Sequence, residues 1–558
     1  MARKPGTQTV CGVEIPAEQR TPLVESLLRV IDQLLAANEQ LQTTIGQQQL
    51  RIEQLEEEVR RLKGLPDKPK RKPEPSPLND PSGPPSTSGE KKKPNTPDGK
   101  RPGSSKRSKT RHLVVHDDVP LPLDGLPDGT KFLGYQDFTV QDLQVQPHNT
   151  RYRRCRYQLP DGTIVTAALP QDVTSHFGPT LRQYVLYQHF HNHVTQPLLH
   201  EELQELGVDI SAGQVNHLLN EGHEAFHQEK DSLLPAAREV SAYLQTDDTS
   251  AKHRGKGGHT LHIGNDLFAS FFTTDTKSRV NFLKILLCPH QGYLFNNDAL
   301  FYLECFEVPQ KLLAQLKSET GWLYEDDESW EAQLDAWKIK SAEQRRLVTE
   351  GALWANLLAH DLYSDLVLIS DDAAQFKLLA FLHALCWVHM ERHVAQLIPL
   401  TPAQRTAHEA VRDAIWDYYQ RLKAYRESPT PMRRARLEKD FDRLFLQKTG
   451  WPELNEVLRK IHGKKSELLL VLDHPEIPLH NNLSENDIRQ YVKKRKISAG
   501  TRSDAGRRCR DTFLSLKTTC RKLGVTFWSY LRDRINNLQD IPPLADLIRR
   551  KATELANA

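Results

Sequence analysis

Three acidic positions that lie far apart in the sequence could bind divalent cations together. Asp247 and Asp371 each stand at the end of a short apolar run, and Glu485 stands near the start of a basic helical stretch. Mg²⁺ prefers carboxylate oxygens, and two such ions can stabilise both the attacking and the leaving oxygen of a phosphoryl displacement. A lone carboxylate beside Lys and Arg is more often a salt-bridged surface group. The chemistry therefore depends on the three acids meeting.

The two aspartates belong to predicted strands. Residues 239–248 and 365–372 contain apolar runs that end in acidic pairs, which is typical of buried strands with carboxylates at their carboxyl ends. Ligands of open α/β sheets bind at that edge. Neighbouring strand residues face opposite sides of a sheet, so Asp247 and Asp248 are alternatives for one place in the site.

Residues 480–500 predict the helix that brings the third acid. Ser484 or Asn482 can cap this helix, and Glu485 then falls in its first turn. Three cations follow on the face of Glu485 at helical spacing. They are Arg489, Lys493 and Lys496. Glu485 and these three cations would therefore lie on the same face of the helix, as contacts to phosphates require.

The order of the predicted elements is that of a ribonuclease-H-like α/β core. Three strands, a helix and a second acid-tipped strand are predicted across residues 239–289 and the beginning of residues 361–500. Residues 290–360 contain four tryptophans and dense charges at helical spacing. They predict a helical insertion between the two parts of the core.

A long apolar helix is predicted over residues 373–398. Cys386, His389 and His393 would share one of its faces, so a metal site there is an alternative. No fourth ligand is apparent nearby in the sequence, and histidines on such a helix are more often packed or phosphate-facing. We therefore assign His389 and the neighbouring Arg392 to DNA binding.

The N-terminal part predicts a dimer. Within residues 21–64 apolar residues repeat every seven, and one seam contains an asparagine. This pattern favours a parallel two-stranded coiled coil, and hence a homodimer, over an amphipathic helix packed on its own domain. The seam residues are Leu27, Ile31, Leu34, Asn38, Leu41, Ile45, Ile52, Leu55, Val59 and Leu62.

A polar tail, residues 1–20, precedes the coiled coil, and a basic linker predicted to be disordered, residues 65–112, follows it. Residues 68–111 contain 13 Lys or Arg against 4 Asp or Glu, whereas the whole chain carries a net charge of only +3. The prolines of the linker exclude a continuous basic helix, and with it a basic-zipper arrangement. Such a tether either lies along a phosphate backbone or merely keeps the chain soluble.

Two small regions stand between the linker and the core. Residues 113–170 alternate in strand fashion between Asp-Gly turns and predict a small β domain. Residues 171–238 predict short helices joined by a glycine-containing turn. This pattern is compatible with a helix-turn-helix whose second helix offers Gln214 and His217 to base edges.

The C-terminal region and the cysteines complete the pattern. Residues 501–558 predict a basic helical region, and Arg502 is a further candidate DNA contact. The seven cysteines are scattered without a C-x-x-C pair, which fits a reducing cytoplasm and neither a disulfide framework nor a zinc ribbon. The longest apolar run is shorter than the ~18 residues of a membrane span, so a cytoplasmic, nucleoid-associated protein is expected.

These motifs resemble the DDE transposases of the bacterial insertion sequence sixty-six family, the large catalytic protein of those elements. The likeness extends from about residue 27 to residue 535, in the order of the family's regions. Three motifs carry the likeness. They are Asp247-Asp248-Thr249, then Ser370-Asp371 followed later in the chain by Cys386-Trp387-Val388-His389, and finally Asn481-Asn482-Leu483-Ser484-Glu485. The last motif is the most specific.

The resemblance implies a multidomain α+β protein that cleaves transposon ends and transfers their 3′-hydroxyls to target DNA. Asp247, Asp371 and Glu485 would hold Mg²⁺ or Mn²⁺, and the resemblance favours Asp247 over Asp248. The implied partners are double-stranded DNA, as terminal inverted repeats and as target, a second copy of the chain, and helper proteins of the same element. No membrane is expected.

The sequence also departs from the family. Only Cys155 remains where the family carries paired cysteines, so the β domain is expected to fold without zinc, and Asp248 replaces a usual glutamate. Two other functions stay open. One is a catalytically inactive, dimeric DNA-binding regulator, and the other is a ribonuclease-H-like nuclease without strand transfer.

Overall fold

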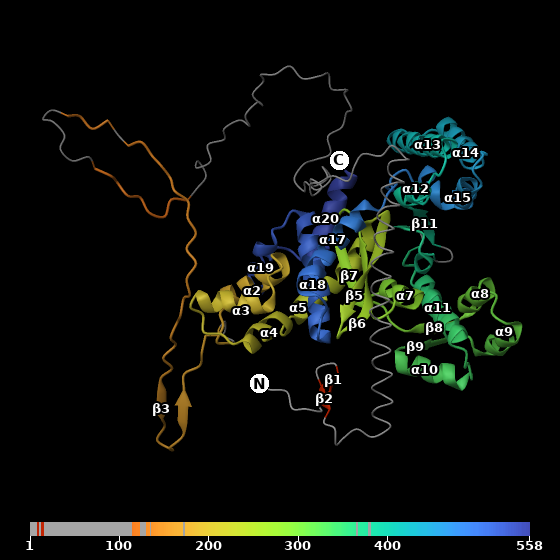
Figure 1. Cartoon of the computed structure of the whole chain (residues 1–558). Coiled ribbons are helices and arrows are strands. Elements are labelled where there is room, and N and C mark those ends of the chain that lie inside the picture. The colour runs from red at the N-terminus through yellow and green to blue at the C-terminus, as the bar shows by residue number, and fades with distance from the viewer. Residues whose placement is uncertain are drawn as a thin grey trace. The chain divides into compact units, whose positions relative to one another are not determined.

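A computed structural model describes residues 8–10, 13–15, 114–122, 130–133, 135–170, 173, 175–363, 366–377 and 381–557 (Figure 1). The predicted coiled coil, residues 21–64, and the predicted linker, residues 65–112, lie outside these residues, so both stay predictions. The chain divides into two compact units, residues 1–139 and 140–558. Among the described helices, none offers an apolar stretch that would span a membrane.

Each side of the boundary between the units contains a small hairpin. In the first unit, β1 (Gln8–Val10) pairs antiparallel with β2 (Val13–Ile15). In the second unit, β3 (Arg156–Gln158) pairs antiparallel with β4 (Ile164–Thr166). The Asp-Gly turn predicted between these last two strands is confirmed, since Gly162 has a φ of 84°.

The alternating residues 138–145, which belong to the predicted β domain, form no strand. These residues have no regular structure, and every side chain from residue 140 to residue 170 is exposed. An alternating strand buries its apolar face only against a partner strand and a second layer, and the described part of this region supplies neither. The region therefore shows a single hairpin in place of the packed β domain that the alternation predicts.

Short helices precede the sheet, as predicted for residues 171–238. They are α2 (Pro179–Leu186), the π-helical turn η3 (Tyr187–His191), α3 (Gln196–Glu205), α4 (Ala212–Asn220), α5 (Glu224–Asp231) and α6 (Leu233–Val240). Gly207 follows α3 with a φ of 84°, and the Ser211 hydroxyl accepts a hydrogen bond from the N–H of Gln214 (3.2 Å). The predicted glycine-containing turn is thus confirmed, and Ser211 caps α4.

A five-stranded sheet lies at the centre of the second unit (Figure 1). In sheet order its strands are β11 (Leu382–Leu385), β10 (Val367–Ser370), β5 (Tyr243–His253), β6 (Lys256–Gly264) and β7 (Ala269–Thr274). β5, β6 and β7 are antiparallel neighbours, while β10 runs parallel to both β5 and β11. This mixed sheet is consistent with the predicted ribonuclease-H-like core.

The long helix predicted over residues 373–398 is wrong. The chain there forms the short turn η5 (Ala374–Phe376), the strand β11 and the helix α12 (Trp387–Ala395). A short apolar run has the same pattern in a buried strand and in a buried helix. Parallel pairing with β10 decides the outcome, because it buries this run in the sheet.

Residues 290–360 are mostly helical, with a short strand pair among the helices, and three of their tryptophans belong to the main hydrophobic core. Trp330, Trp337 and Trp354 are buried, whereas Trp322 is exposed. The elements that follow β7 are α7 (Arg279–Leu287), β8 (Tyr293–Phe295), α8 (Asn297–Cys305), α9 (Gln310–Leu316), η4 (Lys317–Glu319), β9 (Trp322–Tyr324), α10 (Asp327–Ala336) and α11 (Ala342–Ala359).

A second helical group follows α12 and shares a separate hydrophobic core with β10 and β11. Its elements are α13 (Pro402–Glu427), α14 (Pro431–Phe445), α15 (Pro452–His462), α16 (Lys465–Leu468) and η6 (Leu470–Leu472). The chain ends in α17 (Asn482–Ser498), α18 (Asp504–Leu523), α19 (Phe527–Asn536) and α20 (Leu544–Ala556).

Side chains of α18 close the edge of the sheet at β7. The backbone N–H groups of β7 donate to α18 in three pairs: Ala269 to Thr519 Oγ1 (3.1 Å), Phe271 to Ser515 Oγ (2.9 Å) and Thr273 to Asp511 Oδ2 (2.7 Å). Acceptors four residues apart on a helix recur about every 6 Å, which matches the ~6.7 Å between alternate strand residues. Burial raises the pKa of Asp511 to about 6.

Candidate active site

Asp247 and Asp371 lie side by side where β10 ends. β5 and β10 run parallel, and Ile369 pairs with Gln245. Two residues further along both strands, Asp371 comes level with Asp247. The sheet thus brings together the two aspartates that the sequence singled out.

Asp247 carries surplus negative charge around it. Burial raises its pKa to about 7, the N–H of Asp248 opposes this shift, and the charges of Asp371, Asp248 and Glu485 add to it. The opposing N–H donates to Oδ1 of Asp247 over 2.8 Å. Burial, together with the nearby negative charges, makes ionisation of this carboxyl costly, and a cation would be stabilised at such a place.

The alternation along β5 decides which acid faces α17. The side chain of Gln245 accepts from the N–H of Ser484 (3.4 Å), and the hydroxyl of Thr249 accepts from Arg495 (3.4 Å), both on α17. Because alternate strand residues share a face, Asp247 faces α17 as well. The residues alone left this choice open.

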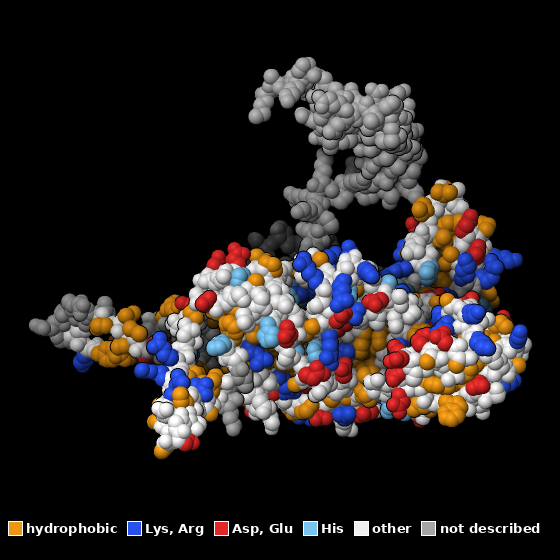
Figure 2. All heavy atoms as spheres, turned by 90° about the horizontal axis from the view of Figure 1, so that it is seen from below, with side chains coloured by type: hydrophobic (Ala, Val, Ile, Leu, Met, Phe, Trp, Pro, Cys, Tyr) orange, Lys and Arg blue, Asp and Glu red, His pale blue; other side chains and the backbone are white. Residues whose placement is uncertain are grey.

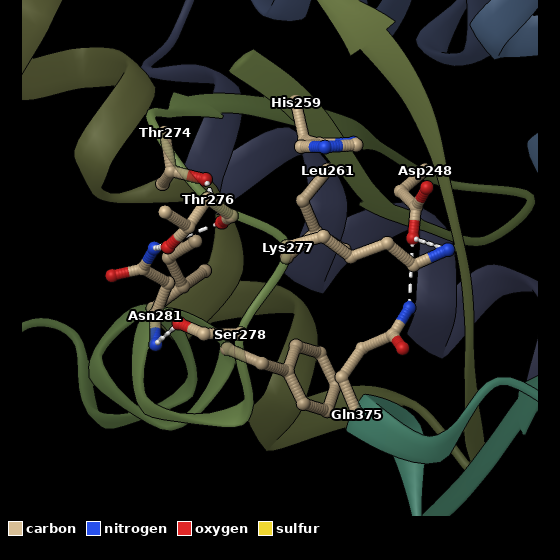
Figure 3. Close-up of a pocket in the computed structure, with 11 residues that line it drawn as sticks. Asp248, His259, Leu261, Thr274, Thr276, Lys277, Ser278, Asn281 and Gln375 are labelled. Atoms are coloured by element: carbon tan, nitrogen blue, oxygen red, sulfur yellow. Dashed lines mark hydrogen bonds and ion pairs between the residues drawn. The ribbon is translucent and has the colours of Figure 1, made fainter. Parts of the chain in front are cut away.

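Asp248 points to the opposite face and is already paired there (Figure 3). Its Oδ2 accepts from Lys277 Nζ (2.8 Å) and from Gln375 Nε2 (2.8 Å). Gln375 lies on η5, four residues after Asp371, so this bond ties the turn after β10 to β5. No sequence signal marked Gln375, because its partner is 127 residues away.

The turn that follows Asp371 is held at several further points. Oδ1 of Asp371 accepts from the N–H of Ala373 (3.1 Å), and Arg279 on α7 donates to the carbonyl of Ala374 (2.7 Å). Asp372 forms ion pairs with Lys377 (2.7 Å) and with Lys464. The carboxylate of Asp371 is therefore carried by a turn with few remaining degrees of freedom.

Both ends of α17 are fixed on β5, and this places Glu485. At the first end, Asn481 is fully buried and donates from Nδ2 to the carbonyl of Thr246 (2.8 Å), next to Asp247. At the other end, a Cβ on Gly500 would lie 2.5 Å from the carbonyl oxygen of Lys252. These two anchors hold the first turn of α17, with Glu485, near the tip of β10.

Glu485 is paired with α12. Its Oε1 lies 3.4 Å from Arg392 Nη2 and 3.5 Å from His389 Nε2. Burial lowers the pKa of His389, and the charge of Arg392 lowers it further. The two residues predicted to bind DNA thus surround the third acid.

Cys386 does not share a helical face with the two histidines, which corrects the alternative metal site. It is the residue before α12, and its Sγ accepts from the N–H of Asn481 (3.2 Å). The reason is the strand β11, which takes up the residues that a continuous helix would have used. Within the described residues, no three His, Cys, Asp or Glu side chains lie close enough together to hold a metal ion.

The carboxylates nevertheless suit a hard divalent cation by their chemistry. Asp247, Asp371 and Glu485 offer oxygen donors only, and their charges act on one another. In the structure Glu485 is paired with Arg392 instead of approaching the aspartates. The raised pKa of Asp247 reflects the free-energy cost of ionising this buried carboxyl. A bound cation would offset that cost.

A buried polar network lies under α17 and was missed in the sequence. His262 on β6 contacts Ser484 Oγ through Nδ1 (3.0 Å) and lies 3.2 Å from Asp487 Oδ2 through Nε2. Asp487 also pairs with Lys522 Nζ on α18 (2.7 Å). Although a Ser-His-Asp set is the arrangement of a nucleophilic triad, the Ser484 and His262 side chains are fully buried, so this network serves structure.

The remaining predicted DNA contacts are all exposed. Gln214 and His217 are exposed on α4, where His217 pairs with Glu221 (2.8 Å). Four further predicted contacts, Arg489, Lys493, Lys496 and Arg502, are exposed on and after α17. Helical spacing from Glu485 puts the first three on the side of α17 that carries the acid.

Comparison with known proteins identifies the class. Residues 322–508 match the family described as "Transposase IS66 family", a match that contains Asp371 and Glu485. The chain is also 41% identical over 323 residues to the uncharacterized protein y4jO of Sinorhizobium fredii (strain NBRC 101917 / NGR234), which covers 57% of this chain and 100% of that protein. The chain belongs to the IS66 family of DDE transposases. Membership implies DNA binding and transposition.

Asp247→Asn is expected to stabilise the metal-free protein at neutral and alkaline pH. Folding raises the carboxyl pKa from 3.8 to about 7, so the folded state keeps a proton that the unfolded state loses. Wild-type stability therefore falls as the pH rises from about 4 to about 7 and stays lower above that range. Thermal unfolding in EDTA should show a gain in Tm that is near zero at pH 4 and constant above pH 7. A gain that does not change with pH contradicts the raised pKa.

Proposed function

We propose that this chain is an active DNA transposase that cleaves the ends of its element and transfers the freed 3′-hydroxyls to target DNA with the aid of Mg²⁺. The observation that supports this most directly is the pKa of Asp247, which burial raises to about 7 and to which the charges of Asp371 and Glu485 add. A buried carboxyl that lies within the field of two further acids carries a cost in folding, and a role in cation binding would account for that cost.

Asp247, Asp371 and Glu485 would hold the ions. When bound, a pair of Mg²⁺ ions supplies activation of the attacking oxygen and stabilisation of the leaving oxygen. The chain itself positions these acids through Asn481, which fixes α17 on β5, and through Gln375, which fixes the turn after β10. Both are positioning residues.

The basic residues on α17 and α12 would bind the phosphates on either side of the cleaved bond. Lys493 and Lys496 are exposed on α17, and Arg392 of α12 is about half exposed while it contacts Glu485. Arginine and lysine near the reacting phosphate stabilise its charge and orient it. Substrate binding would thus draw Arg392 toward a phosphate and release Glu485 for the cation.

Product analysis tests the proposal against a nuclease. The full chain is incubated with Mg²⁺ and a plasmid that carries the gene with its flanking inverted repeats, and separately with a pre-cleaved end that has a free 3′-hydroxyl and a circular target. A transposase joins the pre-cleaved end to the target circle. A nuclease of the same fold releases nicked or shortened strands and forms no joint molecules.

A DNA-binding regulator is the second candidate. It is favoured by the pairing of Glu485 with Arg392 and by the lack, among the described residues, of three acids at metal-binding distance. This candidate predicts binding to the element ends without any metal-dependent nicking or joining. The pre-cleaved substrate separates the two candidates, because it removes the need for the first cleavage.

Gln375→Leu is expected to weaken cation binding roughly tenfold or more, because outer groups that orient metal ligands typically contribute that much. The leucine removes the bond to Asp248 and frees the turn that carries Asp371. Titration of Mn²⁺ followed by electron paramagnetic resonance measures the affinity without reference to activity. Gln420→Leu, at an exposed position on α13, is the matched control. Equal Mn²⁺ affinity in Gln375→Leu and the control contradicts the positioning role.

A further inference from the structure

The β3–β4 hairpin presents an unusual run of side chains. Residues 151–157 read Arg-Tyr-Arg-Arg-Cys-Arg-Tyr, and all seven are exposed. Tyr152 and Tyr157 retain 47% and 63% of their accessible surface. None of the hydrophobic clusters formed by the described residues includes this run, so packing within that part of the chain does not account for its composition.

The arginines of this run lack acidic partners. Among the described residues, no carboxylate forms an ion pair with Arg151, Arg153 or Arg156. Arginines elsewhere are commonly paired, as Arg434 is with Asp473 (2.6 Å). Figure 2 likewise shows acidic and basic side chains interspersed over the face that it presents. The hairpin therefore concentrates positive charge that the fold leaves uncompensated.

The hairpin is held by its own bonds. Arg154 Nε donates to the carbonyl of Ala167 (2.5 Å), and the N–H of Ala167 donates to the carbonyl of Cys155 (2.9 Å). At the turn, Asp161 Oδ1 accepts from the N–H of Thr163 (2.9 Å). Arg154 thus has a structural role, while Arg151, Arg153 and Arg156 are free for a ligand.

We propose that the β3–β4 hairpin binds double-stranded DNA through Arg151, Arg153 and Arg156. A two-stranded ribbon fits the ~12 Å width of the major groove, and arginine pairs with phosphate oxygens in a fixed geometry. The exposed tyrosine hydroxyls add donors to the same backbone. The inference rests on the proposed function only in taking DNA as the substrate, and not on catalysis.

The triple variant R151Q/R153Q/R156Q of the full chain tests the proposal. Binding to a labelled duplex of the element end is measured in EDTA over a range of NaCl concentrations. Because each phosphate contact contributes about 0.9 to the slope of log K against log salt, the slope should become smaller by about 2 to 3. Affinity near 150 mM salt should fall roughly tenfold or more.

A control triple variant removes the same charge from paired, exposed arginines. R436Q/R443Q/R550Q alters side chains that pair with Asp440 (3.8 and 2.7 Å) and Glu554 (3.9 Å). It should keep the wild-type slope. The hairpin triple should keep the wild-type Tm, since the side chains of its three arginines form no bond within the part of the chain that the structure describes. R154Q, in contrast, removes a bond that holds the hairpin.

Three outcomes overturn the inference: a wild-type slope in the hairpin triple, an equal loss of slope in the control, or an equal loss on single-stranded DNA of the same sequence. Failure of the proposed function is distinct from all three. A catalytically inactive protein would join no ends and still show the loss of slope. A protein that does not use the hairpin would join ends at low salt and show no loss.

Discussion

The E485Q variant is expected to lose strand joining by roughly 10³-fold or more while it still binds the element ends, since removal of one member of a catalytic set typically has an effect of this size. The amide keeps the shape of the side chain but removes the charge. Asp247 would then feel one negative charge fewer, so a cation gains less at the site. Joining of a pre-cleaved end in Mg²⁺ and duplex binding in EDTA are the two measurements.

Glu453 provides the matched control for this substitution. It occupies the first turn of α15, as Glu485 does in α17, and it is exposed. Glu453→Gln should therefore join ends at the wild-type rate. Asp247→Asn and Asp371→Asn should behave as Glu485→Gln does, whereas Asp248→Asn should retain measurable joining, because Asp248 faces Lys277 and Gln375. If Asp247→Asn, Asp371→Asn or Glu485→Gln joins ends at the wild-type rate, the substituted acid does not belong to the proposed set.

Asp487→Ala is expected to lower the free energy of unfolding by about 3–5 kcal/mol, which is the usual cost of removing one partner from a buried ion pair. The Asp487 side chain is only 4% exposed, and its partner Lys522 is 10% exposed. The substitution removes the carboxylate that balances the Lys522 ammonium, which keeps its bond to the carbonyl of Asn265 (2.6 Å), and it takes the same carboxylate away from His262 Nε2. Urea unfolding followed by circular dichroism measures the change.

The double variant Asp487→Leu, Lys522→Met isolates the cause. If the unpaired charge dominates, removing both charged groups should recover much of the loss, because no ammonium remains buried alone. A loss below about 1 kcal/mol in Asp487→Ala would show that water enters the network and that the pair is not truly buried.

The sequence predicted the elements that carry the acids, because each has a local signal. An apolar run that ends in aspartates marks β10 and the middle of β5, which continues to His253. The predicted cap of α17 is wrong: the helix begins at Asn482 after Asn481, and Ser484 lies inside it. The face of Asp247 was not readable, since it depends on which alternate residues meet α17. Gln245 and Thr249 lie on the same face of β5 as Asp247, and their bonds to α17 show which way that face points. Those bonds cannot be read from the sequence.

Other features could not be read because they depend on distant partners. β11 was taken for helix, since a buried strand of four residues has no period that separates it from a helix. The residues from 138 to 145 alternate as a strand does, yet alternation cannot supply the second layer that a strand needs. No local pattern marks Gln375, His262 or Lys522. Gln375 and His262 each contact a residue more than a hundred positions away in the sequence. Lys522 lies on α18 and pairs with a residue of α17.

The way α18 meets β7 limits how two copies of this protein can associate. An outer strand with free amides invites a neighbouring molecule to continue the sheet. Here Thr519, Ser515 and Asp511 already occupy the amides of Ala269, Phe271 and Thr273. Two copies of this core therefore cannot join their sheets through β7, and any sheet continued between copies would have to use the opposite edge, at β11.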